Sequence, residues 1–90
     1  MHYQFAPRSV CSRLIDFDLD EQNKIHNLAF FSGCPGNLAA ISKLLEGVDA
    51  QHAIDVLKGN TCGQRPTSCA DQLSIALEGA LSGELAPAGM

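Results

Sequence analysis

The sequence predicts an α+β fold in which an antiparallel β-hairpin or small meander is followed by three helices. Two observations carry this prediction. Before residue 31 apolar and polar residues alternate, as in half-buried strands, and after residue 37 apolar residues recur with the period of an amphipathic helix. Strands grouped ahead of helices favour an α+β arrangement over alternating parallel units.

The hairpin strands are expected over residues 13–20 and 24–31. In the first of them, apolar residues alternate with Asp16, Asp18 and Asp20, so the three aspartates should point away from the core. Such alternation predicts a solvated acidic face, since no glycine pattern of a calcium-binding loop accompanies it.

Residues 21–24 form a polar turn candidate, and residues 3–5 are a candidate for a short third strand that Pro7 interrupts. Helices are expected over three later ranges, with Gly47 and Gly59 as stop signals and Asp49 as an N-cap. These ranges are 37–47, 49–58 and 68–82. Residues 1–82 then make one domain, and residues 83–90 a flexible tail rich in Gly, Pro and Ala.

Composition excludes several function classes. The 90 residues are enough for one domain, and 46% hydrophobic with 18% charged residues fits a folded chain. A formal charge of −4 without any basic run argues against nucleic-acid binding. No apolar stretch approaches the ~18 residues of a membrane span, and no signal-peptide core is present, so the reducing cytoplasm is the expected compartment.

Four cysteines in so short a chain are the main candidate functional residues. Cys11, Cys34, Cys62 and Cys69 are separated by 22, 27 and 6 residues. In a reducing compartment they indicate metal binding, thiol reactivity or burial in the core, not a disulfide framework. Cys34 and Cys69 fall where helices are expected to begin, and the helix dipole there favours the thiolate, which is both metal ligand and nucleophile.

Four thiolates satisfy the ligand count of tetrahedral zinc, and an iron–sulfur cluster uses the same ligands. The spacing matches neither the short pairs of zinc fingers nor the ferredoxin run, so packing of all four thiols in the core stays an alternative. His2, His26 and His52 are expected to be ordinary surface or hydrogen-bonded residues. No nucleophile motif, acid–base pair or phosphate-binding loop is recognisable, so catalysis by this chain alone is not expected.

Several segments resemble the TSCPD-domain family, and together the resemblance covers roughly residues 3–82. They are Cys62-Gly63-Gln64-Arg65-Pro66-Thr67-Ser68-Cys69-Ala70-Asp71-Gln72-Leu73, Gly33-Cys34-Pro35-Gly36-Asn37-Leu38 and Val10-Cys11-Ser12-Arg13. Ala70 stands where the family name implies Pro. The family also occurs as the C-terminal domain of adenosylcobalamin-dependent ribonucleotide reductases, so the resemblance implies a reductase as a partner, without reductase catalysis by this chain.

A more distant resemblance is to iron–sulfur scaffolds of the NifU-N/IscU-like family. Cys11, Cys34 and Cys69 fall on the three cluster ligands of that family, and the resemblance implies a scaffold-like fold. Arg13 stands where the scaffold pattern has an Asp, which argues against cluster transfer. Cys62 has no counterpart there and could supply the missing ligand.

These observations lead to one preferred hypothesis and two alternatives. The preferred hypothesis is a small accessory or scaffold domain that binds one metal centre, zinc first and an iron–sulfur cluster second, through Cys11, Cys34, Cys62 and Cys69. The first alternative is a redox or accessory module of a ribonucleotide reductase. The second is a dimeric interaction module without metal.

Overall fold

The computed structural model describes residues 1–7, 14–31, 35–59 and 69–87; of residues 35–37 and 69 it describes the backbone alone. A three-stranded antiparallel sheet comes first and three helices follow, which confirms the α+β prediction. In chain order the elements are β1 His2–Phe5, β2 Leu14–Leu19, β3 Ile25–Phe31, α1 Pro35–Leu45, α2 Ala50–Leu57 and α3 Cys69–Ser82.

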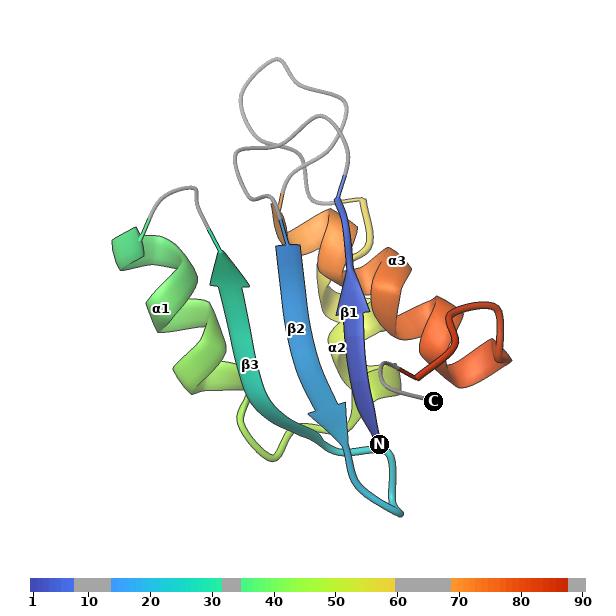
Figure 1. The fold of residues 1–90 in the computed structure, drawn as a ribbon. Helices are drawn as coiled ribbons and strands as arrows, with labels where there is room; N and C mark the ends of the chain where they lie inside the picture. Colours follow the sequence, from blue (N-terminus) through green and yellow to red (C-terminus); the bar gives the residue numbers. More distant parts are fainter. Residues whose placement is uncertain (8–13, 32–34, 60–68, 88–90) are drawn as a thin grey trace.

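The sheet has the strand order β1-β2-β3, and helices cover one of its faces. In Figure 1, α2 and α3 lie together behind the sheet, while α1 runs beside β3 at its edge. The buried sides of α2 and α3 pack on the inward side chains of the strands. On the other face, the described side chains of His2 and Gln4 are exposed and those of Asp16 and Asp18 half-buried, as expected for an antiparallel sheet with one packed side.

The core follows the predicted alternation in β2. Ile15, Phe17 and Leu19 are buried, whereas Asp16 and Asp18 between them are half-buried on the other face. Tyr3 of β1 stacks on Phe17 with ring centroids 5.4 Å apart and planes 19° apart. Each such buried side chain contributes about 1.5–3 kcal/mol of hydrophobic stabilisation. The helices contribute Ala53, Ile54, Leu73, Ala76 and Leu77 to the same core.

A bulge interrupts the pairing of β2 with β3. Asp16 pairs with Ala29 and Asp18 with His26, so two residues of β3 face one residue of β2. One of the two, Asn27, has a φ of 56°, a left-handed conformation that Asn tolerates better than most residues. The bulge keeps Leu28 buried while His26 and Asn27 both lie toward solvent.

The helix ends follow the predicted signals closely. The Asp49 carboxylate caps α2 by accepting a hydrogen bond of 3.1 Å from the amide of His52. Gly47 and Gly59 follow α1 and α2 with φ of 79° and 83°, where a side chain would be strained. The first helix begins at Pro35, two residues earlier than predicted, since proline is well suited to the first helical position.

The residues after α3 turn back onto it. The amide of Leu85 donates to the carbonyl of Gly79 at 3.0 Å, and the Leu85 side chain packs at the margin of the core. Flexibility of the tail over residues 83–90 stays a prediction, and residues 88–90 lie outside the described part of the chain. Among the described residues, no helix has both the length and the apolar character that a membrane span requires.

Candidate functional site

The cysteines predicted to bind metal lie largely outside the described residues. This holds for Cys11, Cys34 and Cys62 entirely, and of Cys69 only the backbone is described. In residues 1–7, 14–31, 35–59 and 69–87, no three His, Cys, Asp or Glu side chains are grouped so that they could hold a metal ion. Metal binding through the four thiols therefore stays a prediction.

The described residues nearest to these cysteines in sequence lie at one end of the sheet, the upper end in Figure 1. Phe5 at the end of β1 pairs with Ile15, and Leu14 at the start of β2 pairs with Phe31 at the end of β3. The starts of α1 and α3 lie at this end as well. We call it the cysteine end.

Two helices begin next to predicted ligands. The first residue of α3 is Cys69, and the first residue of α1 is Pro35, which directly follows Cys34 in the sequence. Unpaired amides at a helix start, together with the helix dipole, favour negative charge. Both helices thus begin within two residues of the predicted starts.

A hydrogen bond ties α3 to the end of α2 at this same end of the domain. The amide of Gly59 donates to Oδ1 of Asp71, in the first turn of α3, at 2.7 Å. Cys62 is three residues after Gly59, and Cys69 is two residues before Asp71. The two chain segments that lead toward Cys62 and Cys69 are therefore joined directly.

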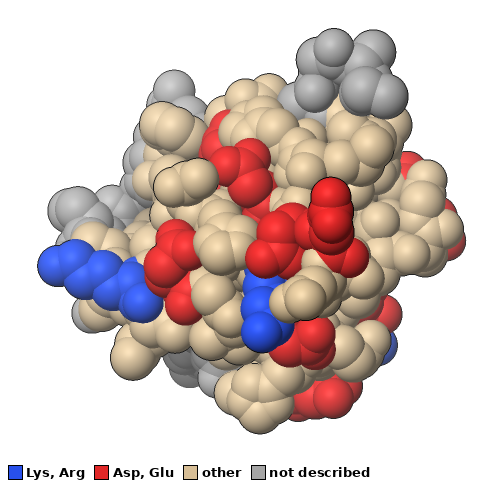
Figure 2. Space-filling model, turned by 90° about the horizontal axis from the view of Figure 1, so that it is seen from below, with Lys and Arg blue, Asp and Glu red and all other residues tan. Residues whose placement is uncertain are grey.

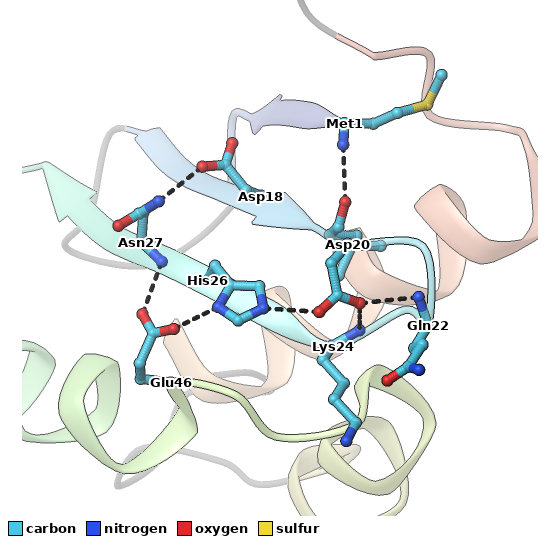
Figure 3. Close-up of polar contacts among 9 residues, drawn as sticks. Met1, Asp18, Asp20, Gln22, Lys24, His26, Asn27 and Glu46 are labelled. Carbon is cyan, nitrogen blue, oxygen red and sulfur yellow. Dashed lines mark hydrogen bonds and ion pairs between the residues drawn. The ribbon is translucent and has the colours of Figure 1, made fainter.

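A second group of polar side chains lies on the outward face of the sheet, and Figure 3 shows the part of it around His26. His26 of β3 is at its centre, with 37% of its side chain exposed. Its Nδ1 lies 2.5 Å from Oε2 of Glu46, just after α1, and its Nε2 lies 2.8 Å from Oδ2 of Asp20. The imidazole ring therefore connects the β2–β3 turn to the chain that leaves α1.

The two carboxylates beside His26 also accept hydrogen bonds from backbone amides. Oε1 of Glu46 accepts from the amide of Asn27 at 2.9 Å. Oδ1 of Asp20 accepts from the amides of Gln22 and Lys24 at 2.9 and 3.0 Å. Each carboxylate thus orders a turn or bulge and, with its second oxygen, contacts the ring.

His2 of β1 extends this group across the sheet. Its Nε2 lies 2.9 Å from Oδ2 of Asp16, and its Nδ1 lies 2.6 Å from Oδ1 of Asp18. Oδ2 of Asp18 in turn accepts from the Asn27 side chain at 2.9 Å. We call the resulting set the His–carboxylate cluster, and its members are His2, Asp16, Asp18, Asp20, His26 and Glu46.

Hydrogen bonding shifts the ionisation of the groups around His26. Its contacts with Asp20, and then with Glu46, raise the pKa of the His26 imidazole above its usual value. The amide of Lys24, then His26, lower the pKa of Asp20 to about 2. The amide of Asn27, followed by His26, lowers the pKa of Glu46.

The same effects act at the other end of the cluster. The hydrogen bond to Asp18 raises the pKa of His2. The side chain of Asn27, then His2, lower the pKa of Asp18. Protonated imidazoles and ionised carboxylates are therefore the favoured forms over a common pH range.

The sequence predicted part of this cluster and missed the rest. It correctly placed Asp16, Asp18 and Asp20 on the outward side of the hairpin. It gave no role to His2 and His26, because their partners depend on the strand register and on a segment 20 residues away from His26. A histidine and an aspartate at outward positions of paired strands are the signal that could have indicated the contact.

Acidic groups gather at the end of the sheet that carries the β2–β3 turn. Figure 2 views the molecule from the end that carries the β2–β3 turn, and acidic side chains predominate on the surface shown. Asp20 and Glu46 of the cluster are at this end, which we call the turn end. Here the described residues supply carboxylates and imidazoles and no thiol.

A family model for the TSCPD domain matches residues 1–81, nearly the full length of the chain. Searches of curated proteins and of solved structures found no match. The matched range spans all the strands and helices described above except the last residue of α3. This chain belongs to the TSCPD-domain family.

Proposed function

We propose that this domain binds one metal centre through Cys11, Cys34, Cys62 and Cys69 and acts as an accessory or scaffold module. Zinc is the first candidate, and an iron–sulfur cluster is the second. The observation that carries the proposal is the position of the described residues flanking these cysteines, which lie at one end of the sheet. The chain on either side of three sequence-distant segments, 8–13, 32–34 and 60–68, thus comes to one end of the domain.

The strand pairing limits how far apart two of the ligands can be. Leu14 and Phe31 are paired across neighbouring strands, and Cys11 and Cys34 are each three residues beyond this pair. Three residues of chain span at most about 11 Å. Both cysteines are therefore tethered to neighbouring residues at the cysteine end of the sheet, which supports a shared site.

The other two ligands are tethered in a similar way. The hydrogen bond between Gly59 and Asp71 joins two chain segments. Cys62 is three residues after Gly59, and Cys69 is two residues before Asp71. Tetrahedral zinc bound by four thiolates needs Zn–S distances of about 2.3 Å, so all four sulfurs must meet within about 4 Å of one another. The short tethers make that convergence geometrically reachable.

The helix starts supply the matching electrostatics. A thiolate at Cys69, or at Cys34 directly ahead of α1, would be close to the positive end of a helix dipole. Metal binding requires the deprotonated thiol, so this environment favours binding at neutral pH. Packing of neutral thiols in the core would not require helix starts at these positions.

Metal analysis of protein purified without oxygen tests the proposal. We expect about one zinc per chain in a colourless protein, or iron and sulfide in a brown one. Changing Cys69→Ser should lower metal content and melting temperature together, and each of the other three Cys→Ser changes should do the same. The control is Ile54→Val in the described core, which should cost about 0.5–1.5 kcal/mol and leave the metal content unchanged. A metal-free parent protein, or full metal content in the Cys69→Ser variant, contradicts the proposal.

A second candidate function is that of an accessory domain that binds to a ribonucleotide reductase. Membership in the TSCPD family supports it, because the sequence resembles the C-terminal domain of adenosylcobalamin-dependent reductases. In this role the thiols would exchange electrons or secure docking while the reductase performs the chemistry. Stimulation of a reductase by the added domain, and its loss in Cys→Ser variants, would support this role. No effect of the domain on reductase activity would leave the metal-binding proposal standing alone.

A further inference from the structure

His26 is held at both ring nitrogens by carboxylates from two different segments. Nδ1 faces Oε2 of Glu46 at 2.5 Å, and Nε2 faces Oδ2 of Asp20 at 2.8 Å. A carboxylate only accepts hydrogen bonds, and a neutral imidazole has one N–H. Both contacts can be hydrogen bonds only when the ring carries two protons.

We infer that His26 is a proton-dependent clamp that fixes the chain leaving α1 against β3 and the β2–β3 turn. When the ring loses a proton, one nitrogen presents a lone pair to a carboxylate oxygen, and that contact becomes repulsive. Either Asp20 or Glu46 must then turn away or recruit water. This inference does not depend on metal binding, because it concerns residues at the turn end only.

The clamp acts on a segment that is otherwise joined to β3 by its backbone. The amide of Gly47 donates to the carbonyl of Ile25 at 2.6 Å, and the amide of Ile25 donates to the carbonyl of Val48 at 2.9 Å. Glu46 adds the contact with the Asn27 amide at the bulge. If Glu46 turned away, the Asn27 amide would lose its hydrogen-bond acceptor, while the backbone hydrogen bonds of Gly47 and Ile25 would stay in place.

The charged groups around the imidazole make the clamp sensitive to the protonation of His26. Asp18 of β2 is the cross-strand neighbour of His26, and its charge opposes ionisation of Glu46. The side chain of Lys24 points away from the ring in Figure 3. The charged and titratable groups on the segments that meet at the ring are the N-terminal amine of Met1 and the side chains of His2, Asp16, Asp18, Asp20, Glu21, Lys24, Lys43, Glu46 and Asp49.

The direction of the pH effect follows from the two protonated rings. With His2 and His26 protonated, two positive charges face the four carboxylates of the cluster. The folded-state pKa of His26 is raised, so its stabilising effect is complete below the usual value of about 6.5. That effect is lost as the pH rises through the raised value. Loss of the proton leaves the carboxylates less compensated.

An NMR titration of the full chain from about pH 5 to about pH 9 tests the inference. The His26 ring should titrate above about 6.5, and the amide signal of Asn27 should move with the same midpoint. In Glu46→Gln the ring midpoint should fall toward about 6.5, because one charged partner is gone. In His26→Gln the Asn27 amide should no longer follow that midpoint, whereas the control His52→Gln should leave both signals unchanged.

Denaturant unfolding gives a second, independent readout. Between about pH 6 and pH 8.5 the wild type should lose more stability than His26→Gln, since only the wild type gives up the protonated clamp. Equal losses in the two proteins would overturn the inference. So would a His26 midpoint at or below about 6.5. The inference would also fail if neither the Asn27 amide, bound to Glu46, nor the Gln22 and Lys24 amides, bound to Asp20, shifted with the His26 midpoint. If His26→Gln does not fold, the wild-type and Glu46→Gln titrations still decide the question.

Discussion

The two ends of the sheet are held together by different chemistry. At the turn end, described side chains close the structure through charge-assisted contacts of His26, Asp20 and Glu46. At the cysteine end, strand pairs and the Gly59–Asp71 bond bring together the described residues that flank the four cysteines in the sequence. The turn end is thus closed by protein groups, and at the cysteine end the proposed metal would supply the corresponding link.

This difference bears on how a small domain of 90 residues is stabilised. A core of this size supplies only a few kcal/mol of net stability, so small domains often add a metal or another crosslink. Exposed ion pairs add little each, although a network with several amide donors holds its geometry better than an isolated pair. We therefore expect the cysteine end to depend on its ligand far more than the turn end depends on its charges.

The largest expected effect comes from removing the proposed metal. A chelator should lower the melting temperature by more than about 10 °C, because a structural metal contributes directly to folding. Hydrogen exchange can locate the effect. The Gly59 amide should exchange faster after chelation, whereas the Asn27 amide at the turn end should change much less.

Adding zinc back should restore slow exchange at Gly59, which serves as the control for damage by the chelator. If both amides become faster by the same factor, the metal stabilises the domain only as a whole. The contrast between the two ends would then fail. If neither changes, the cysteine end does not depend on a metal.

An intermediate effect is expected at the bulge, where Asn27 has a positive φ. Asn27→Ala should lower the free energy of unfolding by about 1–2 kcal/mol, since an alanine in the left-handed region is strained. Asn27→Gly should cost less, although both changes remove the hydrogen bond to Asp18. Denaturant unfolding of the two variants measures the difference.

Gln51, exposed on α2, provides the matched control for this pair. In a helix the order reverses, so Gln51→Ala should be more stable than Gln51→Gly by about 1 kcal/mol. The same preference for Ala at both positions would show that the bulge does not hold Asn27 in the left-handed conformation.

The sequence predicted features that depend on neighbouring residues better than features that depend on contacts between distant segments. Helix starts and stops depend on neighbouring residues, so Asp49, Gly47 and Gly59 were read correctly from the sequence. The bulge at Asn27 was not predicted, because it is a property of the register between two strands. The clamp at His26 was missed for the same reason, since the position of Glu46 beside β3 depends on how α1 packs.

The candidate metal site shows the complementary case. Residue type and helix starts were enough to single out the four cysteines, and the described backbone confirms that a helix begins at Cys69. Sulfur positions depend on long-range closure of the segments that carry them, which local patterns do not encode. The sequence can therefore suggest which residues bind the metal without predicting how their sulfur atoms are arranged.

The smallest expected effect concerns the Lys58–Glu78 ion pair, which joins the end of α2 to α3. Its atoms are 3.2 Å apart, yet the two side chains are 63% and 41% exposed. A double-mutant cycle with Lys58→Met and Glu78→Gln should give a coupling free energy below about 0.5 kcal/mol, because water screens both charges and each long side chain loses freedom. Added salt should reduce the coupling further.

The corresponding cycle with His26→Gln and Glu46→Gln at about pH 6 should give a larger coupling free energy, since Glu46 is also fixed by the Asn27 amide. Equal couplings in the two cycles would mean that the network around His26 adds nothing to a simple surface pair, and the turn end would then owe its order to the backbone alone.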